Sequence, residues 1–159
     1  MTTTSSVSNW PHGVVSGLNA PSADKLKLAL YAKPKNFHWR LSGPQFRDYN
    51  LLFDDQASQI SATTNVMAER VRKLGGQTLM SISKIARLQR IADNEGDGIA
   101  TRDMIAELLQ DNQSLTAEMK TLHALWDETG DIATASLLEN WIDEADGRAW
   151  FLLEAGQPR

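Results

Sequence analysis

The sequence predicts an all-α protein built as a four-helix bundle, with a short cross-helix between the second and third long helices. Apolar residues recur at alternating spacings of four and three over long stretches, as they do along the seam of a bundle. Turns that contain glycine separate these stretches into four long helices and one short one. A chain of 159 residues with 42% hydrophobic and 23% charged residues has the size and composition of one domain with its own core.

The first predicted helix begins at Pro21-Ser22 and runs to about Leu41, where Ser42-Gly43-Pro44 ends it. Pro34 lies inside this helix. A proline in a helix interior removes one backbone hydrogen bond and clashes with the preceding turn, at a cost of about 3 kcal/mol. We therefore expect a kink just before His38.

The other helices follow from the same periodicity. The second runs from Phe46 to Leu74 and ends at Gly75-Gly76; the third follows the polar turn at 93–98 and ends at Gly130-Asp131; the fourth closes at 156–158. The stretch 80–89 is amphipathic and predicts the short cross-helix. The predicted inward positions of the long helices are Phe53, Ala57, Ile60, Thr64, Met67, Val71, Leu74, Ile105, Leu108, Asn112, Leu115, Met119, Leu122, Trp126, Leu138, Trp141, Ala145, Ala149 and Leu152.

Composition limits the chemistry and the location. Residues 1–20 are rich in Ser, Thr, Gly and Asn without a period, so we expect a flexible or docked tail before a bundle domain at 21–157. This tail has no Lys or Arg and no apolar run, and no segment approaches a membrane span, which predicts a cytoplasmic protein. Without cysteine, any metal site must use oxygen and imidazole ligands. A net charge of −4 argues against a surface that binds nucleic acid throughout, although it leaves a local basic patch open.

Five potential metal ligands lie between His38 and Glu69. At 100° per residue, Asn50, Asp54, Asn65 and Glu69 fall at about 0°, 40°, 60° and 100° on a helical wheel, which is one narrow polar strip. Such a strip is suited to face a partner or a ligand.

A di-iron site inside one bundle uses a Glu-x-x-His pair from each of two helices. This chain has no such pair, because the residues three positions before its histidines are Asn9, Lys35 and Lys120. The ordinary site within a single bundle is therefore excluded. The strip must either meet a second subunit or be inert.

Several motifs resemble the Dps family of mini-ferritins, the DNA-binding proteins from starved cells. The resemblance covers nearly the whole bundle, and it rests on Lys35-Asn36-Phe37-His38-Trp39, Gly43-Pro44, Phe46, Phe53-Asp54, Met67-Ala68-Glu69-Arg70, Leu74-Gly75-Gly76 and Ala149-Trp150-Phe151. It implies a ferritin-like fold and a shell of twelve subunits that binds Fe(II), oxidises it with hydrogen peroxide or oxygen, and stores ferric iron. The implied role is protection against oxidative damage by peroxide and iron.

The resemblance also implies an iron site shared between two subunits. His38, Asn50 and Asp54 would come from one subunit, and Asn65 and Glu69 from the other. His38, Asp54 and Glu69 match the family and are the candidate catalytic residues, whereas Asn50 stands where the family usually has His and Asn65 where it usually has Asp. The second change lowers the formal ligand charge from −3 to −2, so we expect a site that binds iron weakly and oxidises it slowly, or that takes another divalent ion or water.

Other polar residues have simpler interpretations beside the functional ones. His12 and His123 are expected to be structural, and Trp39 either shields the site, as the resemblance implies, or packs at an interface. The acidic residues of the fourth helix line a cation pore in this family, or form a solvated face: Asp131, Glu139, Asp143, Glu144 and Asp146. Direct DNA binding is expected to be weak, unless Lys84, Arg87 and Arg90 form a surface patch.

Two functions remain open. The chain forms an iron-storing ferroxidase shell with an unusual site, or a catalytically silent shell that keeps the fold for a structural or DNA-protecting role. A monomeric bundle is the weakest alternative.

Overall fold

The computed structural model describes residues 22–76, 78, 81–88 and 91–157, and these residues form helices without any strand. The helices are α2 (Ser22–Arg40), α3 (Phe46–Lys73), α4 (Ile82–Leu88), α5 (Thr101–Glu128) and α6 (Ile132–Ala155). The predicted fold class is confirmed, including the short cross-helix between the second and third long helices. The predicted tail at 1–20 lies outside the described residues.

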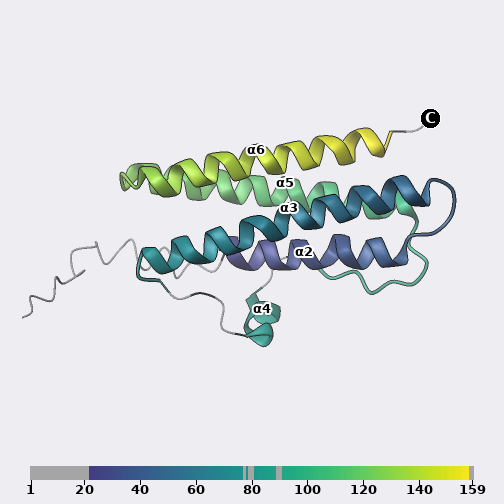
Figure 1. Ribbon diagram of the computed structural model, residues 1–159, viewed down its shortest axis with the longest axis horizontal. Coiled ribbons are helices and arrows are strands. Elements are labelled where there is room, and N and C mark those ends of the chain that lie inside the picture. Colours follow the sequence, from purple (N-terminus) through teal and green to yellow (C-terminus); the bar gives the residue numbers. More distant parts are fainter. Residues whose placement is uncertain (1–21, 77, 79–80, 89–90, 158–159) are drawn as a thin grey trace, which may run out of the picture.

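The four long helices form two helical hairpins that pack on each other. In Figure 1, α2 and α3 run side by side as one hairpin, and α5 and α6 as the other. The hairpins meet where α2 contacts α5 and where α3 contacts α6. The short α4 lies at the side of the bundle and contacts α2 (Figure 1).

The predicted boundaries are close to the observed ones. Gly75 follows α3 with a φ of 79°, in the left-handed region that glycine adopts without strain, and the amide of Gly76 donates to the carbonyl oxygen of Val71 to close the helix. Helix α2 is continuous through Pro34. The kink predicted there therefore does not break the helix.

Two apolar clusters fill the bundle, and a polar layer separates them. One cluster draws on all four long helices, near the end of α2 and the start of α3, and contains Phe37, Leu41, Phe53, Met104, Ile105, Leu108 and Leu152. The other contains Ile60, Met67, Leu74, Ile91, Leu115, Met119, Trp126, Leu138, Trp141 and Ala145. The buried side chains of Gln56, Asn112 and Arg148 come between these two sets on α3, α5 and α6.

The polar layer joins three helices through side-chain hydrogen bonds. The Nε of Arg148 donates to the Oδ1 of Asn112 at 2.9 Å, and the Nε2 of Gln56 donates to the backbone oxygen of Arg148 at 3.0 Å. Burial lowers the pKa of Arg148, while the charge of Glu144 works in the opposite direction. The bond to Asn112 offsets part of the desolvation of the guanidinium of Arg148, a residue that is only 4% exposed.

Two predicted inward positions were wrong by one residue. Thr63 is buried where we expected Thr64, and Arg148 is buried where we expected Ala149; Thr64 and Ala149 are half-buried. Thr63 is accommodated because its hydroxyl donates to the carbonyl oxygen of Ile60 at 2.9 Å. Arg148 is accommodated by its bond to the neighbouring helix.

Candidate metal site

The antiparallel hairpin of α2 and α3 brings three of the five predicted ligands to one place. His38, in the last turn of α2, lies against Asn50 near the start of α3. Lys35 lies one turn before His38 on α2, and Asp54 lies one turn after Asn50 on α3. The side chains of Lys35 and Asp54 are in contact. We call His38 and Asp54, with Asn50 beside them, the α2–α3 half-site.

His38 is held by two reciprocal hydrogen bonds to Asn50. Its Nδ1 lies 3.0 Å from the backbone oxygen of Asn50, and the side-chain Nδ2 of Asn50 donates to the backbone oxygen of His38 at 3.3 Å. A carbonyl oxygen only accepts, so Nδ1 carries the proton, and in the neutral form of the ring the lone pair lies on Nε2. Metal-binding histidines are commonly oriented in this way. The amide of Asn50 also satisfies one of the end carbonyls of α2.

Asp54 forms an ion pair with Lys35. The hydrogen bond and charge of Lys35 hold the pKa of Asp54 below its ordinary value, against the effect of desolvation, and the same hydrogen bond raises the pKa of Lys35. The side chains stay partly exposed, 42% for Asp54 and 25% for Lys35. This role of Lys35 was not predicted from the sequence, although its position three residues before His38 puts both on one face of α2.

The other two predicted ligands lie far along α3. The Nδ2 of Asn65 donates to the Oε1 of Glu69 at 2.9 Å, and both residues are exposed. Glu69 follows Asp54 by 15 positions on α3, which corresponds to about 22 Å along the helix. Across the described residues, no group of three His, Asp or Glu side chains could hold a metal ion. Within one chain, the predicted ligands therefore form two separate sets.

Exposed apolar side chains flank both sets of ligands. Trp39 follows His38 and is 73% exposed. Leu51 follows Asn50, and Val66 follows Asn65; both are exposed on α3. Exposed apolar side chains next to polar ones are typical of a surface that binds another protein.

Asp131 has a structural role at the start of α6. Its carboxylate caps α6 by accepting from the backbone amide of Thr134 at 3.2 Å, and it pairs with the Nη2 of Arg70 at 2.6 Å. Burial acts to raise the pKa of Asp131, but the hydrogen bonds from Thr134 and Arg70 outweigh it and hold that pKa below its ordinary value. Asp131 therefore fixes the end of α3 to the start of α6.

The remaining acidic residues of α6 lie on its exposed side. The Oε1 of Glu139 lies 2.9 Å from the Nε2 of His123, and the carboxylate of Asp146 lies 3.8 Å from the ammonium of Lys120. His123 thus has a structural partner, as expected for it. The side chains of these acidic residues are exposed: Glu139, Asp143, Glu144 and Asp146.

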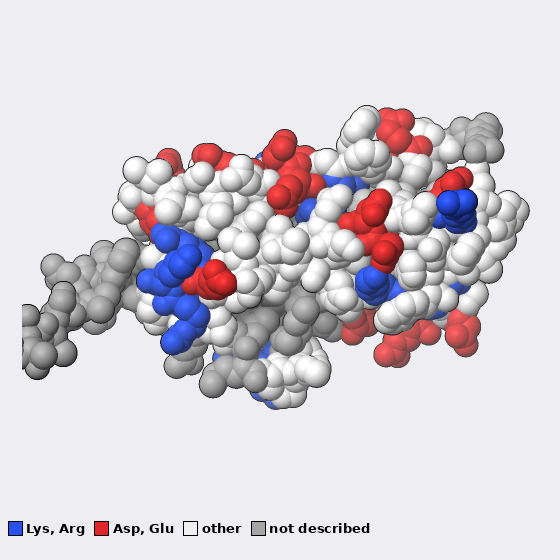
Figure 2. All heavy atoms as spheres, viewed as in Figure 1, with Lys and Arg blue, Asp and Glu red and all other residues white. Residues whose placement is uncertain are grey.

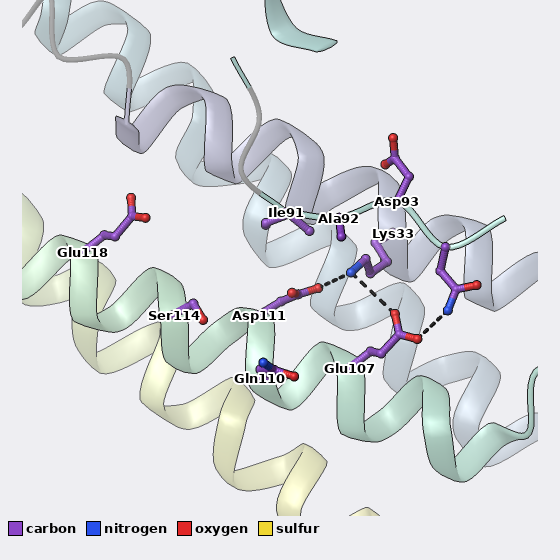
Figure 3. A pocket seen from close by; sticks show the side chains of 10 residues that line it. Lys33, Ile91, Ala92, Asp93, Glu107, Gln110, Asp111, Ser114 and Glu118 are labelled. Atoms are coloured by element: carbon purple, nitrogen blue, oxygen red, sulfur yellow. Dashed lines mark hydrogen bonds and ion pairs between the residues drawn. The ribbon is translucent and has the colours of Figure 1, made fainter. Parts of the chain in front are cut away.

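A second polar site lies between α2, α5 and the segment before α5. A cavity of about 430 Å³ is lined there by residues that include Asp93, Glu107 and Asp111. Figure 3 shows Lys33 reaching between Asp111 and Glu107; its ammonium lies 2.6 Å from the first carboxylate and 3.6 Å from the second. Burial raises the pKa of Asp111, although Lys33 works to lower it. Each charge here already has a partner, so the geometry indicates a structural ion pair.

Basic side chains gather at one end of the bundle. Figure 2 shows Lys and Arg grouped at the left, near the end of α3, while Asp and Glu are spread along the rest of this face. The last turn of α3 carries Arg70, Arg72 and Lys73, where cations stabilise a helix C-terminus. In the predicted patch on α4, Arg87 is exposed and Lys84 half-buried, while Arg90 lies outside the described residues.

Comparison with known proteins agrees with the motifs and the fold. A family model described as a ferritin-like domain matches residues 17–155. A DNA protection during starvation protein of Brevibacillus brevis is 28% identical over 125 residues, covering 79% of this chain and 83% of that protein. The X-ray structure of Dps from Thermosynechococcus elongatus superposes with a TM-score of 0.85 at 27% identity, over 91% of this chain and 92% of that one. The chain belongs to the Dps family of mini-ferritins.

One further relative extends the family likeness. A low temperature-induced protein of Nostoc sp. is 32% identical to this Dps-type chain over 149 residues, covering 92% of this chain and 82% of that protein. Among the helices that the structure describes, none is long and apolar enough to span a membrane.

Proposed function

We propose that this Dps-type chain assembles into a shell that takes up Fe(II), oxidises it and stores it as ferric iron. The α2–α3 half-site of one copy supplies His38 and Asp54, and a second copy supplies Glu69. The proposed shell has twelve subunits, as the resemblance to the Dps family implies. The proposed role is protection against oxidative damage in the cytoplasm.

The orientation of His38 carries this proposal. Its Nδ1–H donates to a backbone carbonyl, which leaves the lone pair on Nε2, and the carboxylate of Asp54 lies one helical turn further along α3 from Asn50. An imidazole and a carboxylate suit Fe(II) and similar divalent ions, so the donor atoms fit the cargo. The remaining ligand, Glu69, lies about 22 Å along the same helix, so it reaches this half-site only from another copy. The exposed Trp39 and Leu51 give such a copy an apolar contact surface.

In the proposed reaction, the shared site holds Fe(II) as substrate. Each Fe(II) gives one electron; with peroxide as oxidant, two Fe(II) ions supply the pair that breaks the O–O bond, and two hydroxides form. Carboxylates favour Fe(III) over Fe(II), and this site has an amide at Asn65 instead of a third carboxylate. We therefore expect oxidation that is slower than a site with three carboxylates would give.

The test is an anaerobic Fe(II) titration of the purified assembly, followed by a pulse of hydrogen peroxide. Wild type should show saturable binding and measurable oxidation of the bound Fe(II), and His38→Ala should lose both. His123→Ala is the matched control, because it removes an imidazole whose partner is Glu139, away from this site. Unsaturable uptake that is the same in all three proteins would refute the shared site.

A catalytically silent shell is the second candidate. The pairing of Asp54 with Lys35 favours it, because the carboxylate is already neutralised, and so do the local bonds of Asn50 and Asn65. This alternative predicts an intact assembly that binds no Fe(II) at His38. In either case we propose weak direct DNA binding, because residues 1–20 contain no Lys or Arg to contact phosphate.

A further inference from the structure

We propose that Lys35 is the resident cation of the α2–α3 half-site, and that a divalent metal ion binds to Asp54 only by displacing its ammonium group. This inference rests on the proposed function, because it concerns how the same half-site admits metal. It assigns to Lys35 control over both the affinity and the selectivity of the site.

The register of the hairpin places Lys35 at this carboxylate. Lys35 and His38 lie three residues apart on α2, and they face Asn50 and Asp54, four residues apart on α3. The contact of His38 with Asn50 therefore brings Lys35 onto Asp54 in the next turn. The ammonium contacts the Oδ1 of Asp54, the same carboxylate that the proposed site needs as a ligand.

An exposed ion pair of this kind contributes little to folding. Its larger effect is on the charge of the half-site. With a neutral imidazole, Asp54 alone makes the half-site negative, and Lys35 makes it neutral. An arriving divalent ion loses the attraction of a free carboxylate and is also repelled by the ammonium until Lys35 turns away.

Displacement also discriminates between metal ions. Hard ions that prefer oxygen, such as Mg²⁺, gain little from His38 and must compete with Lys35 for one carboxylate. Ions with a stronger preference for imidazole, such as Fe(II), Co(II) and Zn(II), gain a nitrogen bond in return. Lys35 therefore excludes the abundant hard cations while it admits the softer ones.

The test is equilibrium binding of Co(II) to the purified assembly, measured by titration calorimetry and by the visible absorption of bound Co(II). Lys35→Met should tighten binding about fivefold, since displacing the ammonium from an exposed ion pair opposes metal binding by up to about that factor. Lys35→Arg keeps the charge and should stay within about twofold of wild type. Lys120→Met is the matched control, because it also removes a lysine paired with an aspartate, but on α5 and α6.

The gain must depend on the half-site, so Lys35→Met combined with His38→Ala should lose it. Lys35→Gln is measured beside Lys35→Met, so that the result does not depend on a single variant. The elution volume of each variant checks that it still forms the assembly. If wild type, Lys35→Met and Lys35→Gln bind Co(II) with equal affinity and His38→Ala does not bind it, the role of Lys35 is overturned and the proposed site is retained. Binding only in the neutral variants would uphold Lys35 and overturn iron oxidation by wild type. No binding in any protein would overturn both.

Discussion

Substitution of Lys33 by Met tests how much the buried ion pair beside α5 stabilises the fold. The side chain of Lys33 is 7% exposed, and its ammonium lies between Asp111 at 2.6 Å and Glu107 at 3.6 Å. Methionine has a similar length and keeps most of the apolar packing. The change therefore removes mainly the charge and leaves two carboxylates close together without their cation.

The magnitude follows from the burial of these groups. Removing one partner of a fully buried pair costs about 3–5 kcal/mol. Asp111 is partly open to the cavity in Figure 3, so water compensates some of the loss, and we expect a decrease of about 2–3 kcal/mol in the free energy of unfolding at pH 7. For a chain of this size, that corresponds to a melting temperature about 4–12 °C lower.

The pH dependence of the deficit has a definite sign. Burial raises the pKa of Asp111 in the folded protein, so its ionisation opposes folding: stability is fullest below the ordinary carboxyl pKa of about 3.9 and falls as the pH rises through the raised value. Without Lys33, which works to lower that pKa, it rises further. The deficit of Lys33→Met should therefore shrink between pH 7 and pH 4.

Thermal unfolding of wild type and Lys33→Met at both pH values measures this effect. Lys120→Met is the control, because its partner Asp146 lies at 3.8 Å and both side chains are more than half exposed. We expect a change below about 1 kcal/mol for that surface pair. A deficit for Lys33→Met no larger than that of the control, or one that grows on acidification, would refute the assignment of Lys33 and Asp111 as a stabilising buried pair.

Two further predictions concern the cap of α6 and a pair of glycines. Asp131→Ala should lower stability by about 1 kcal/mol at pH 7, because Asp131 caps α6 and its pKa is depressed by bonds from Thr134 and Arg70. That advantage exists above the ordinary carboxyl pKa of about 3.9 and is lost as the pH falls through the depressed value, so urea unfolding should show the gap closing on acidification below the ordinary value; a constant gap would contradict it. Gly75→Ala should lower the free energy of unfolding by about 1–2 kcal/mol, since the φ of Gly75 is 79°. Gly147→Ala inside α6 should raise it by roughly 0.5–1 kcal/mol, because an added Cβ there meets no atom within 4 Å. Denaturant midpoints of the two variants that move in the same direction would contradict these predictions.

The helices could be predicted from the sequence because each carries its own signal. The seams repeat at three and four residues, and glycine marks the ends of α3 and α6. The choice between Arg148 and Ala149 could not be made in this way, because periodicity fixes a direction only to within about one residue and hydrophobicity favours alanine. Burial of Arg148 depends on the Oδ1 of Asn112 on another helix, which no local pattern contains.

The candidate ligands could likewise be named from the sequence, but their partners could not. Helical spacing predicts that Asn50 and Asp54 share a face, and it cannot tell which residue of α2 lies opposite each one. The register of the hairpin decides this, and it depends on how Phe37 packs on Phe53, with ring centroids 6.4 Å apart. With that register, Asp54 faces Lys35.

The charges of the α2–α3 half-site and of Glu69 determine how strongly the proposed shared site would favour Fe(III). Glu69 and Asp54 are the carboxylates available to a shared site, and Lys35 neutralises one of them before any metal ion arrives. An amide in place of a third carboxylate reduces the negative charge further, and both changes weaken the preference for Fe(III) over Fe(II). Removal of Lys35 restores one negative charge without altering a ligand. If charge limits the proposed oxidation of iron, Lys35→Met should oxidise Fe(II) faster than wild type, which a defect in ligand geometry alone would not produce.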